Sequence, residues 1–192
     1  MYRFSLPIYL ASHSPRRLDL LARFGIPFTP LSHDTDEKSG VSADPGERVR
    51  SLAEKKARAA SSGVKKGVVL AFDTVVFLEG KVLEKPKGPA AAFSMLSSLS
   101  GKTHVVYTGM ARLALPSGRC RLYVEKTRVK FRKLEATEIK NYIKTGEPLD
   151  KAGAYGIQGA AGAFIERIEG CFFNVVGLPV KPLMDCLKPY MV

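Results

Sequence analysis

Charged side chains occur in this sequence at positions that a purely structural role explains poorly. Arg16 and Arg17 fall in the first turn of an expected helix, where the helix dipole disfavours cations unless an anion is bound. The other candidates occupy an inner helix face, a strand end, an apolar run and an acidic loop. If they converge on one cleft, the cations would neutralise phosphate oxygens and the carboxylates would hold a divalent metal ion. The candidates are Ser12, Arg16, Arg17, Glu37, Lys56, Asp73 and Lys85.

Asp73 lies in the middle of the apolar run 68–78, which is typical of a strand covered on both faces. A lone buried carboxylate costs several kcal/mol or is forced into its neutral form. A strand end, a bulge or a cavity that holds a cation would relieve this cost. A structural aspartate that accepts bonds from nearby amides is the alternative.

Lys56 shares a helix face with Val49 and Leu52, in a helix expected to begin at residues 44–47. Two interpretations stay open for a lysine on this face. In the first, the stem packs against apolar neighbours and the ammonium escapes to water. In the second, the face borders a cleft and the ammonium points into it.

A scaffold of alternating strands and helices is expected to position these residues. Strand patterns cover 7–11, 68–78, 81–85, 103–115, 121–131 and 163–169, and helix patterns cover 15–24, 44–60, 89–99, 135–144 and 179–190. Residues 150–162 form a loop rich in glycine and alanine, where a backbone can approach a ligand closely. Because strands and helices alternate around one hairpin, we predict an α/β fold with a mixed sheet.

Composition restricts the class of protein further. The 192 residues, 45% hydrophobic and 25% charged, suit one domain or two tightly joined lobes. No apolar run reaches the roughly 18 residues of a membrane helix. Three scattered cysteines and three scattered histidines argue against a disulfide framework and a zinc site, and they fit a reducing cytosol. We therefore expect a cytoplasmic protein without a membrane segment.

The net charge of +12 is concentrated in residues 47–133, which hold 19 Lys/Arg and 6 Asp/Glu. Such a segment suits nucleic acid, an anionic membrane or a phosphate-rich ligand, and a solvated basic surface is the simplest alternative. Its aromatic residues do not form the string of an RNA-recognition motif, so a nucleic-acid-binding module ranks second to a phosphate-handling enzyme. No Walker A motif and no G-x-G-x-x-G after a strand is present, which weakens P-loop and Rossmann interpretations.

Seven segments in register resemble motifs of the Maf family, the homologues of a septum-formation inhibitor that act as nucleoside triphosphate pyrophosphatases. Together they extend over nearly the whole chain. The segments are ASHSPRRLDLL (11–21), LAEKKA (52–57), FDTVV (72–76), LEKP (83–86), LSGKTH (99–104), DKAGAYGIQG (150–159) and NVVGLP (174–179).

This resemblance implies a fold related to that of inosine triphosphate pyrophosphatases. Its features are an elongated mixed sheet with flanking helices and two lobes around a deep cleft, within a single domain over residues 1–192. The implied reaction is metal-dependent hydrolysis of a nucleoside triphosphate between the α and β phosphates, with Mg²⁺ or Mn²⁺, giving the monophosphate and pyrophosphate. A homodimer is the expected assembly, without nucleic acid or membrane as partner.

The resemblance also implies roles in phosphate and metal binding, position by position. Asp73 matches the family's central catalytic carboxylate. Alone or with Glu37, from the loop after the first helix, it would hold the metal and activate water; Asp36 is adjacent and the alignment there is loose. The phosphate-binding loop of the family is matched by Ser12, Arg16 and Arg17, and its cleft lysines are matched by Lys56 and Lys85. The four cations among them would balance the charge on the leaving pyrophosphate.

Gln158 matches a cleft glutamine, and its Gly-Ile-Gln-Gly context resembles the subgroup that acts on dTTP and UTP. The subgroup that favours 7-methyl-GTP usually carries a Ser-Glu form there. For Lys151, in the same motif, a structural role and a ligand contact both stay open. Two residues depart from the family pattern. Phe72 replaces a small residue and either reshapes the pocket or packs in the core, and His13 is expected to be an exposed loop histidine.

Overall fold

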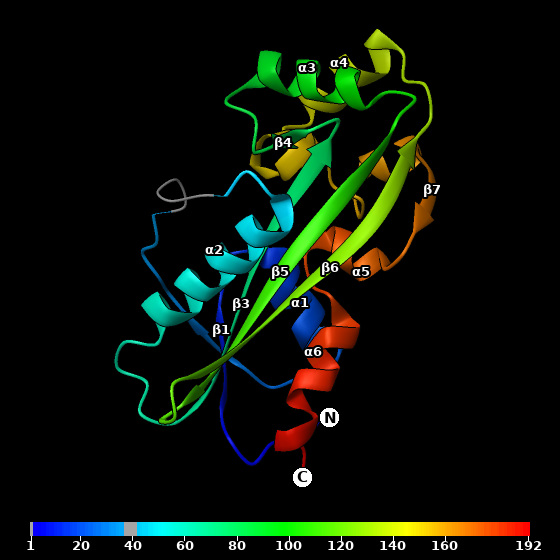
Figure 1. Ribbon diagram of the computed structural model, residues 1–192. Helices are drawn as coiled ribbons and strands as arrows, with labels where there is room; N and C mark the ends of the chain where they lie inside the picture. The colour runs from blue at the N-terminus through cyan, green and yellow to red at the C-terminus, as the bar shows by residue number, and fades with distance from the viewer. Residues whose placement is uncertain (1, 37–41) are drawn as a thin grey trace. The chain divides into compact units, whose positions relative to one another are not determined.

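The computed structural model of the chain describes residues 2–36 and 42–192 (Figure 1). Its strands are β1 (Ile8–Ala11), β2 (Thr29–Leu31), β3 (Gly67–Leu78), β4 (Lys81–Leu83), β5 (Thr103–Leu115), β6 (Arg119–Phe131) and β7 (Ile165–Glu169). Its α-helices are α1 (Pro15–Arg23), α2 (Pro45–Ala60), α3 (Pro89–Leu99), α4 (Ala136–Lys144), α5 (Phe172–Val176) and α6 (Val180–Leu187). Short 3-10 segments are η1 (Glu147–Asp150), η2 (Ala152–Ala154), η3 (Ala160–Phe164) and η4 (Lys188–Tyr190).

The strands within the described residues form one seven-stranded sheet in the order β2-β1-β3-β5-β6-β7, with β4 paired to β3. β1 runs parallel to β2 and β3, whereas β4 is antiparallel to β3 and β7 is antiparallel to β6. The predicted α/β class with a mixed sheet and flanking helices is therefore confirmed. No helix among the described residues is both long and apolar enough to cross a membrane.

The chain divides into two compact units, each assembled from segments that are distant in sequence. Unit 1 comprises Met1–Asp73, Thr108–Glu125 and Gly177–Val192, and unit 2 comprises Thr74–Tyr107 and Lys126–Val176. We describe each unit by itself. The predicted deep cleft and the predicted single domain stay predictions.

The two helices that carry candidate residues in unit 1 begin and end as the sequence predicts. α1 starts at Pro15, where a missing N–H costs nothing, and it is followed by Gly25 with a φ of 65°. α2 is capped by Asp44, whose side chain accepts a hydrogen bond from the amide of Glu47 at 2.7 Å. These signals fix the register of Arg16, Arg17 and Lys56 on their helices.

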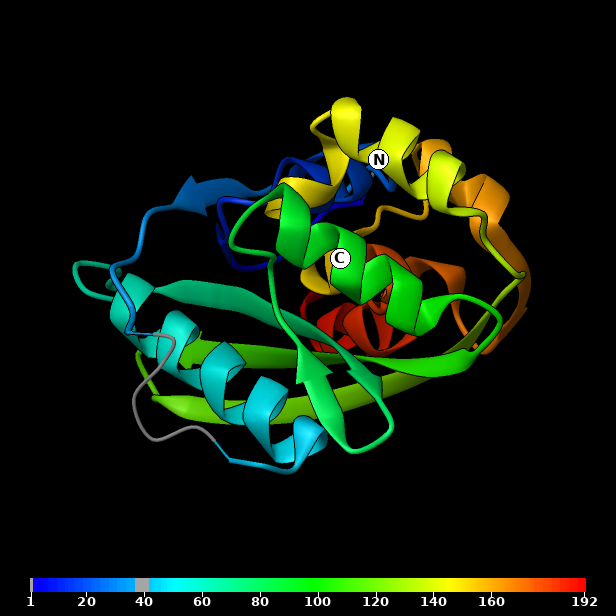
Figure 2. The same ribbon diagram turned by 90° about the horizontal axis from the view of Figure 1, so that it is seen from above.

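Small residues allow α2 to pack closely against the sheet of unit 1. α2 lies on one face of that sheet and α6 lies on the other (Figures 1 and 2). The core under α2 consists mainly of alanines, from α2 itself and from β1, β3 and β5: Ala11, Ala53, Ala57, Ala60, Val69, Ala71, Ala111 and Leu113. At Gly109 a Cβ atom would lie 2.2 Å from the carbonyl oxygen of Val49 on α2, so only glycine fits there.

The core of unit 2 contains four buried aromatic side chains among aliphatic ones: Phe131, Tyr142, Tyr155 and Phe164. The ring of Phe131 meets His104, Tyr155 and Phe164 edge-on, with centroids 4.9 to 6.1 Å apart, as quadrupole attraction favours. Apolar side chains from α3 and α4, among them Leu96 and Ile139, belong to the same cluster. The segment 150–162, expected to be a loop, is anchored to this core.

Several boundaries differ from the sequence prediction. β2 and α5 were not predicted, because a three-residue strand containing proline and a five-residue helix show no periodicity. The predicted strand 81–85 ends at Leu83, and the strand expected from residue 163 begins at Ile165 after η3. The prediction of one helix over residues 179–190 was wrong, because the segment consists of α6, which ends at Leu187, and the 3-10 turn η4. Pro189 lacks an N–H and cannot continue the hydrogen bonding of the α-helix.

The close approach of α2 and β5 predicts a large effect of one methyl group. Gly109→Ala should lower the free energy of unfolding by about 3 kcal/mol or more, because the clash is with backbone atoms that cannot rotate away. Urea unfolding measures the difference. Gly46→Ala, in the first turn of α2, is the matched control and should stay within about 1 kcal/mol of the wild type. Equal stability of the two variants would contradict the packing described.

Candidate active site

The loop between β1 and α1 is organised by a buried hydroxyl group. Ser12 is buried directly after β1, and its Oγ accepts a hydrogen bond from the amide of Ser14 at 3.2 Å. The same Oγ also accepts a hydrogen bond from Nη1 of Arg17 at 3.4 Å. The predicted loop residues Ser12 and Arg17 are therefore in direct contact, and Arg16 is half-buried in the same first turn of α1.

Arg17 binds main-chain carbonyl groups from two other parts of unit 1. Its Nε donates to the carbonyl oxygen of Gly177 at 2.8 Å, and Nη1 donates to that of Phe72 at 3.1 Å. The guanidinium group also lies 5.6 Å from the centre of the Phe72 ring, a cation–π arrangement. Arg17 thus ties the first turn of α1 to the residue that precedes Asp73.

Lys56 and Asp73 form a buried ion pair. Nζ of Lys56 lies 2.6 Å from Oδ1 of Asp73, and the two residues are only 6% and 7% exposed. The charge of each partner offsets the desolvation cost of the other, because Coulomb attraction is strong where water is excluded. Lys56 therefore does not snorkel to water, and the cation that Asp73 requires is supplied by α2.

Unit 1 thus brings four of the predicted site residues into one chain of contacts. Ala11 pairs with Ala71 across β1 and β3, so Ser12 lies beside the strand position that leads to Asp73. The sequence of contacts runs from Ser12 to Arg17, then through the main chain of residues 72 and 73 to Lys56. Glu37, the second predicted carboxylate, lies outside the described residues.

Lys85 and Gln158 belong to unit 2. Both are exposed, and Lys85 makes no ion pair with any residue in 2–36 or 42–192. Lys151 was left open between two roles, and the structure shows contacts of the structural kind: its Nζ donates to the carbonyl oxygen of Glu147 at 2.6 Å and to Asp150 Oδ1 at 2.7 Å. Its ammonium group is therefore engaged within its own loop. Its contact with a ligand stays a prediction.

The two departures from the family pattern have simple structural outcomes. Phe72 is fully buried in β3 and packs in the core beneath Arg17. His13 is exposed, as expected for a loop histidine, and its ring lies 5.1 Å from that of His33. Sequence reasoning missed the carbonyl of Gly177 as a partner of Arg17, because a main-chain acceptor has no side-chain signature.

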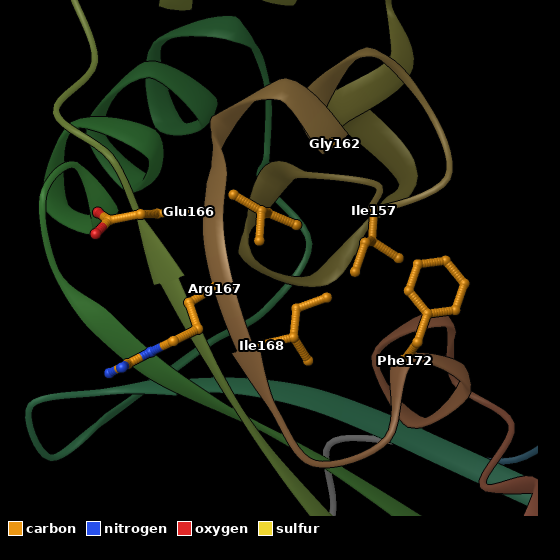
Figure 3. A pocket seen from close by; sticks show the side chains of 7 residues that line it. Ile157, Gly162, Glu166, Arg167, Ile168 and Phe172 are labelled. Carbon is orange, nitrogen blue, oxygen red and sulfur yellow. The ribbon is translucent and has the colours of Figure 1, made fainter.

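A hollow of about 340 Å³ lies in unit 2, beside the loop that carries Gln158 (Figure 3). Most of its wall is apolar, and the lining residues are Ile157, Gly162, Ile165, Glu166, Arg167, Ile168 and Phe172. None of the predicted catalytic or phosphate-binding residues lines it. The hollow is therefore not the predicted active site.

The described residues offer limited means of holding a metal ion. They contain no group of three His, Cys, Asp or Glu side chains placed to share one. Asp73 nevertheless fits a magnesium site, because Mg²⁺ is commonly bound by one or two carboxylates together with substrate phosphates and water. Asp73 supplies one such carboxylate.

Comparison with known proteins assigns the chain to a family. The family model described as "Maf-like protein" matches residues 7–190, and the chain belongs to this family. A Moorella thermoacetica protein named dTTP/UTP pyrophosphatase is 49% identical, over 96% of this chain and 95% of its own. A protein of the same name from Caldanaerobacter subterraneus is 47% identical, over 95% of this chain and 88% of its own. One from Clostridium perfringens is 46% identical, over 96% of this chain and 97% of its own.

A solved structure, titled "The structure of the Staphylococcus aureus Ham1 protein", also matches part of the chain. It covers 65% of this chain and 71% of its own, with a TM-score of 0.46 and 14% sequence identity. A likeness at this level carries no argument about activity. The names of the sequence relatives agree with a nucleotide pyrophosphatase and give no support to a nucleic-acid-binding module.

The ion pair predicts strongly coupled effects on stability. Lys56→Met should lower the free energy of unfolding by about 3–5 kcal/mol, because it leaves the Asp73 carboxylate buried without a cation. Adding Asp73→Asn should restore part of this loss, since the remaining amide carries no charge. Urea unfolding of the single and double variants measures the coupling, with Lys55→Met as the control on the same helix. Additive losses would contradict the pairing.

His104 predicts a pH dependence of stability in unit 2. It is 1% exposed, its Nε2 lies 2.8 Å from the Tyr155 hydroxyl, and burial lowers the pKa of His104 to about 4. Because this pKa is below the value of about 6.5 in an unfolded chain, the stabilising contribution is present above pH 6.5 and is lost as the pH falls towards 4. Between pH 7 and pH 4 the loss should reach about 3 kcal/mol.

The measurement is urea unfolding across this pH range for the wild type and His104→Gln. The variant lacks the buried imidazole, so its stability should fall less steeply below pH 6.5. Identical slopes would show that His104 is not the titrating group.

Proposed function

We propose that this protein hydrolyses dTTP and UTP between the α and β phosphates, releasing the nucleoside monophosphate and pyrophosphate. The observation that carries the proposal is the buried Lys56–Asp73 pair, joined through the main chain at Phe72 to Arg17 and Ser12. A buried carboxylate beside ordered cations suits water activation next to a polyphosphate. Relatives of 46–49% identity that are named dTTP/UTP pyrophosphatase support the same substrates.

Each charged side chain has a distinct part in this proposal. Arg16, Arg17 and Ser12 bind phosphate oxygens at the start of α1, where helix amides also favour anions. Lys56 fixes the orientation of the Asp73 carboxylate through a charge-assisted hydrogen bond. Asp73 accepts the proton of a water molecule whose oxygen attacks the α-phosphorus, and the bond to the bridging oxygen then breaks. Lys85 neutralises the charge on the departing pyrophosphate.

We propose that Asp73, together with Glu37, holds Mg²⁺ or Mn²⁺. When bound, such an ion supplies positive charge against the phosphate oxygens. The chemistry of the two side chains supports this assignment, because Mg²⁺ prefers carboxylate oxygens as ligands. Gln158 is assigned to nucleotide recognition, because it is exposed in a loop whose sequence resembles the dTTP- and UTP-specific subgroup.

We also propose that the protein works in the cytoplasm as a homodimer, with residues 1–192 acting as one Maf-like domain. All three cysteines are free, which fits a reducing compartment. The family match over residues 7–190 supports a single functional domain, because one family description spans segments of both units. The homodimer rests on the family resemblance alone.

The proposed reaction is tested by incubating the protein with a panel of nucleoside triphosphates and Mg²⁺ and scoring the products. Pyrophosphate and the monophosphate should appear together, with dTTP and UTP as the preferred substrates. Omitting the metal should abolish turnover. Orthophosphate as the sole product would replace the proposal with a phosphatase.

In the same assay Asp73→Asn should lower kcat by about 10²–10³, the loss typical of removing one essential polar group from an active site. Asp185→Asn, in an exposed ion pair with Lys181 on α6, is the control and should keep wild-type turnover. Circular dichroism checks that both variants are folded. Wild-type kcat in folded Asp73→Asn would exclude the proposed role of this carboxylate.

A further inference from the structure

The loop 156–160 of unit 2, which carries Gln158 at its centre, is held at both ends by one chain of hydrogen bonds. At its start the amide of Gly156 donates to the Tyr142 hydroxyl at 3.2 Å. At its end the amide of Ala160 donates to Oε2 of Glu147, also at 3.2 Å. The Tyr142 hydroxyl donates to Oε1 of Glu147 at 2.9 Å and joins the two ends.

The Glu147 carboxylate is also packed directly against the backbone of this loop. A Cβ atom at Gly159 would lie 2.1 Å from Oε1 and 2.4 Å from Oε2, so a side chain there would have to displace the carboxylate. Gly159 also donates its amide to the carbonyl oxygen of Gly156 at 3.1 Å, which closes the turn. The carboxylate therefore lies in close contact with the turn.

Neighbouring side chains of the loop face different surroundings. Ile157 packs against the core of unit 2 and lines the hollow beside Phe172 (Figure 3), whereas Gln158 is exposed. A loop anchored through Ile157 and through both of its ends leaves the Gln158 side chain as the group that can reach a ligand. Its placement depends on the groups that hold the loop.

The chemistry of the two anchoring groups is specific. Tyr142 is 4% exposed, and burial raises the pKa of its hydroxyl above the ordinary value, so the group stays protonated and has a hydrogen to donate. Glu147 accepts at both oxygens. Removing the carboxylate would leave the hydroxyl of the buried Tyr142 without its acceptor, which is costly, and would release the exposed Ala160 N–H to water.

We propose that Glu147 is a positioning residue: through Tyr142 and the loop 156–160, it sets the placement of Gln158 against the bound nucleotide. The role in catalysis rests on the proposed pyrophosphatase function, whereas the loop contacts do not. Glu147 acts on substrate binding without touching the reacting atoms. It should therefore affect KM and the preference among bases more than kcat.

The test compares Glu147→Ala, Glu147→Gln and Tyr142→Phe in the full-length protein, with Glu166→Ala as a carboxylate control in the same unit. Glutamine should retain part of the function: its carbonyl accepts from the Ala160 amide and its side-chain amide donates to the Tyr142 oxygen, but the hydroxyl hydrogen of Tyr142 then has no acceptor. Glu147→Ala should raise KM for dTTP about tenfold, the size expected for losing two hydrogen bonds, with kcat changed less than about threefold. Tyr142→Phe should shift KM in the same direction, and Glu166→Ala should not.

Hydrogen exchange followed by mass spectrometry gives a readout that needs no activity. Without nucleotide, peptides covering residues 156–162 should exchange about tenfold faster in Glu147→Ala than in the wild type. The glutamine variant should exchange more slowly than Glu147→Ala, because its carbonyl keeps the bond to the Ala160 amide. Unchanged exchange in Glu147→Ala would overturn the positioning role, and so would equal defects in the alanine and glutamine variants.

A double variant tests whether Glu147 acts through Gln158. If it does, Glu147→Ala combined with Gln158→Ala should have the KM of Gln158→Ala alone, since the group to be positioned is already absent. Multiplicative effects on KM would overturn the proposal. A wild-type protein that releases no pyrophosphate would instead refute the proposed function, and the exchange measurement would still decide whether Glu147 holds the loop.

Discussion

The buried ion pair between Lys56 and Asp73 is the constraint on which the rest of unit 1 depends. A carboxylate in the middle of a covered strand is tolerable only if a cation reaches it, and the cation comes from a helix on the sheet surface. The Lys56 ammonium must therefore lie at a fixed distance from β3. The cap by Asp44 sets the residue at which α2 begins, and the alanine-rich face of α2 sets its distance to the sheet.

Arg17 extends the same network by a different type of interaction. Its partners at residues 72 and 177 are main-chain carbonyl groups, and their acceptor strength does not change with pH. The first turn of α1 is thereby attached to β3 immediately before the carboxylate. A ligand that contacts this turn would be placed relative to Asp73 by main-chain geometry more than by flexible side chains.

Much of this arrangement could be predicted from the sequence, one residue at a time. Asp73 was identified because its charge conflicts with an apolar run, and Lys56 because it shares a face with valine and leucine. Their pairing could not be predicted, since it depends on how a helix 17 residues away in sequence lies on a strand. The hydrogen bonds to Glu147 that fix the loop of Gln158 were also missed. Glu147 begins a short 3-10 segment after a helix, and such a segment shows no periodic pattern.

The alanine-rich face of α2 also limits which substitutions this helix can accept. Ala53 and Ala57 touch no proposed ligand, and on the exposed face of a helix they would tolerate many replacements. Here a bulkier side chain would lift α2 and withdraw the lysine from its carboxylate. Tolerance to substitution at these two inert positions is therefore set by a charge pair whose acidic partner lies on a different element.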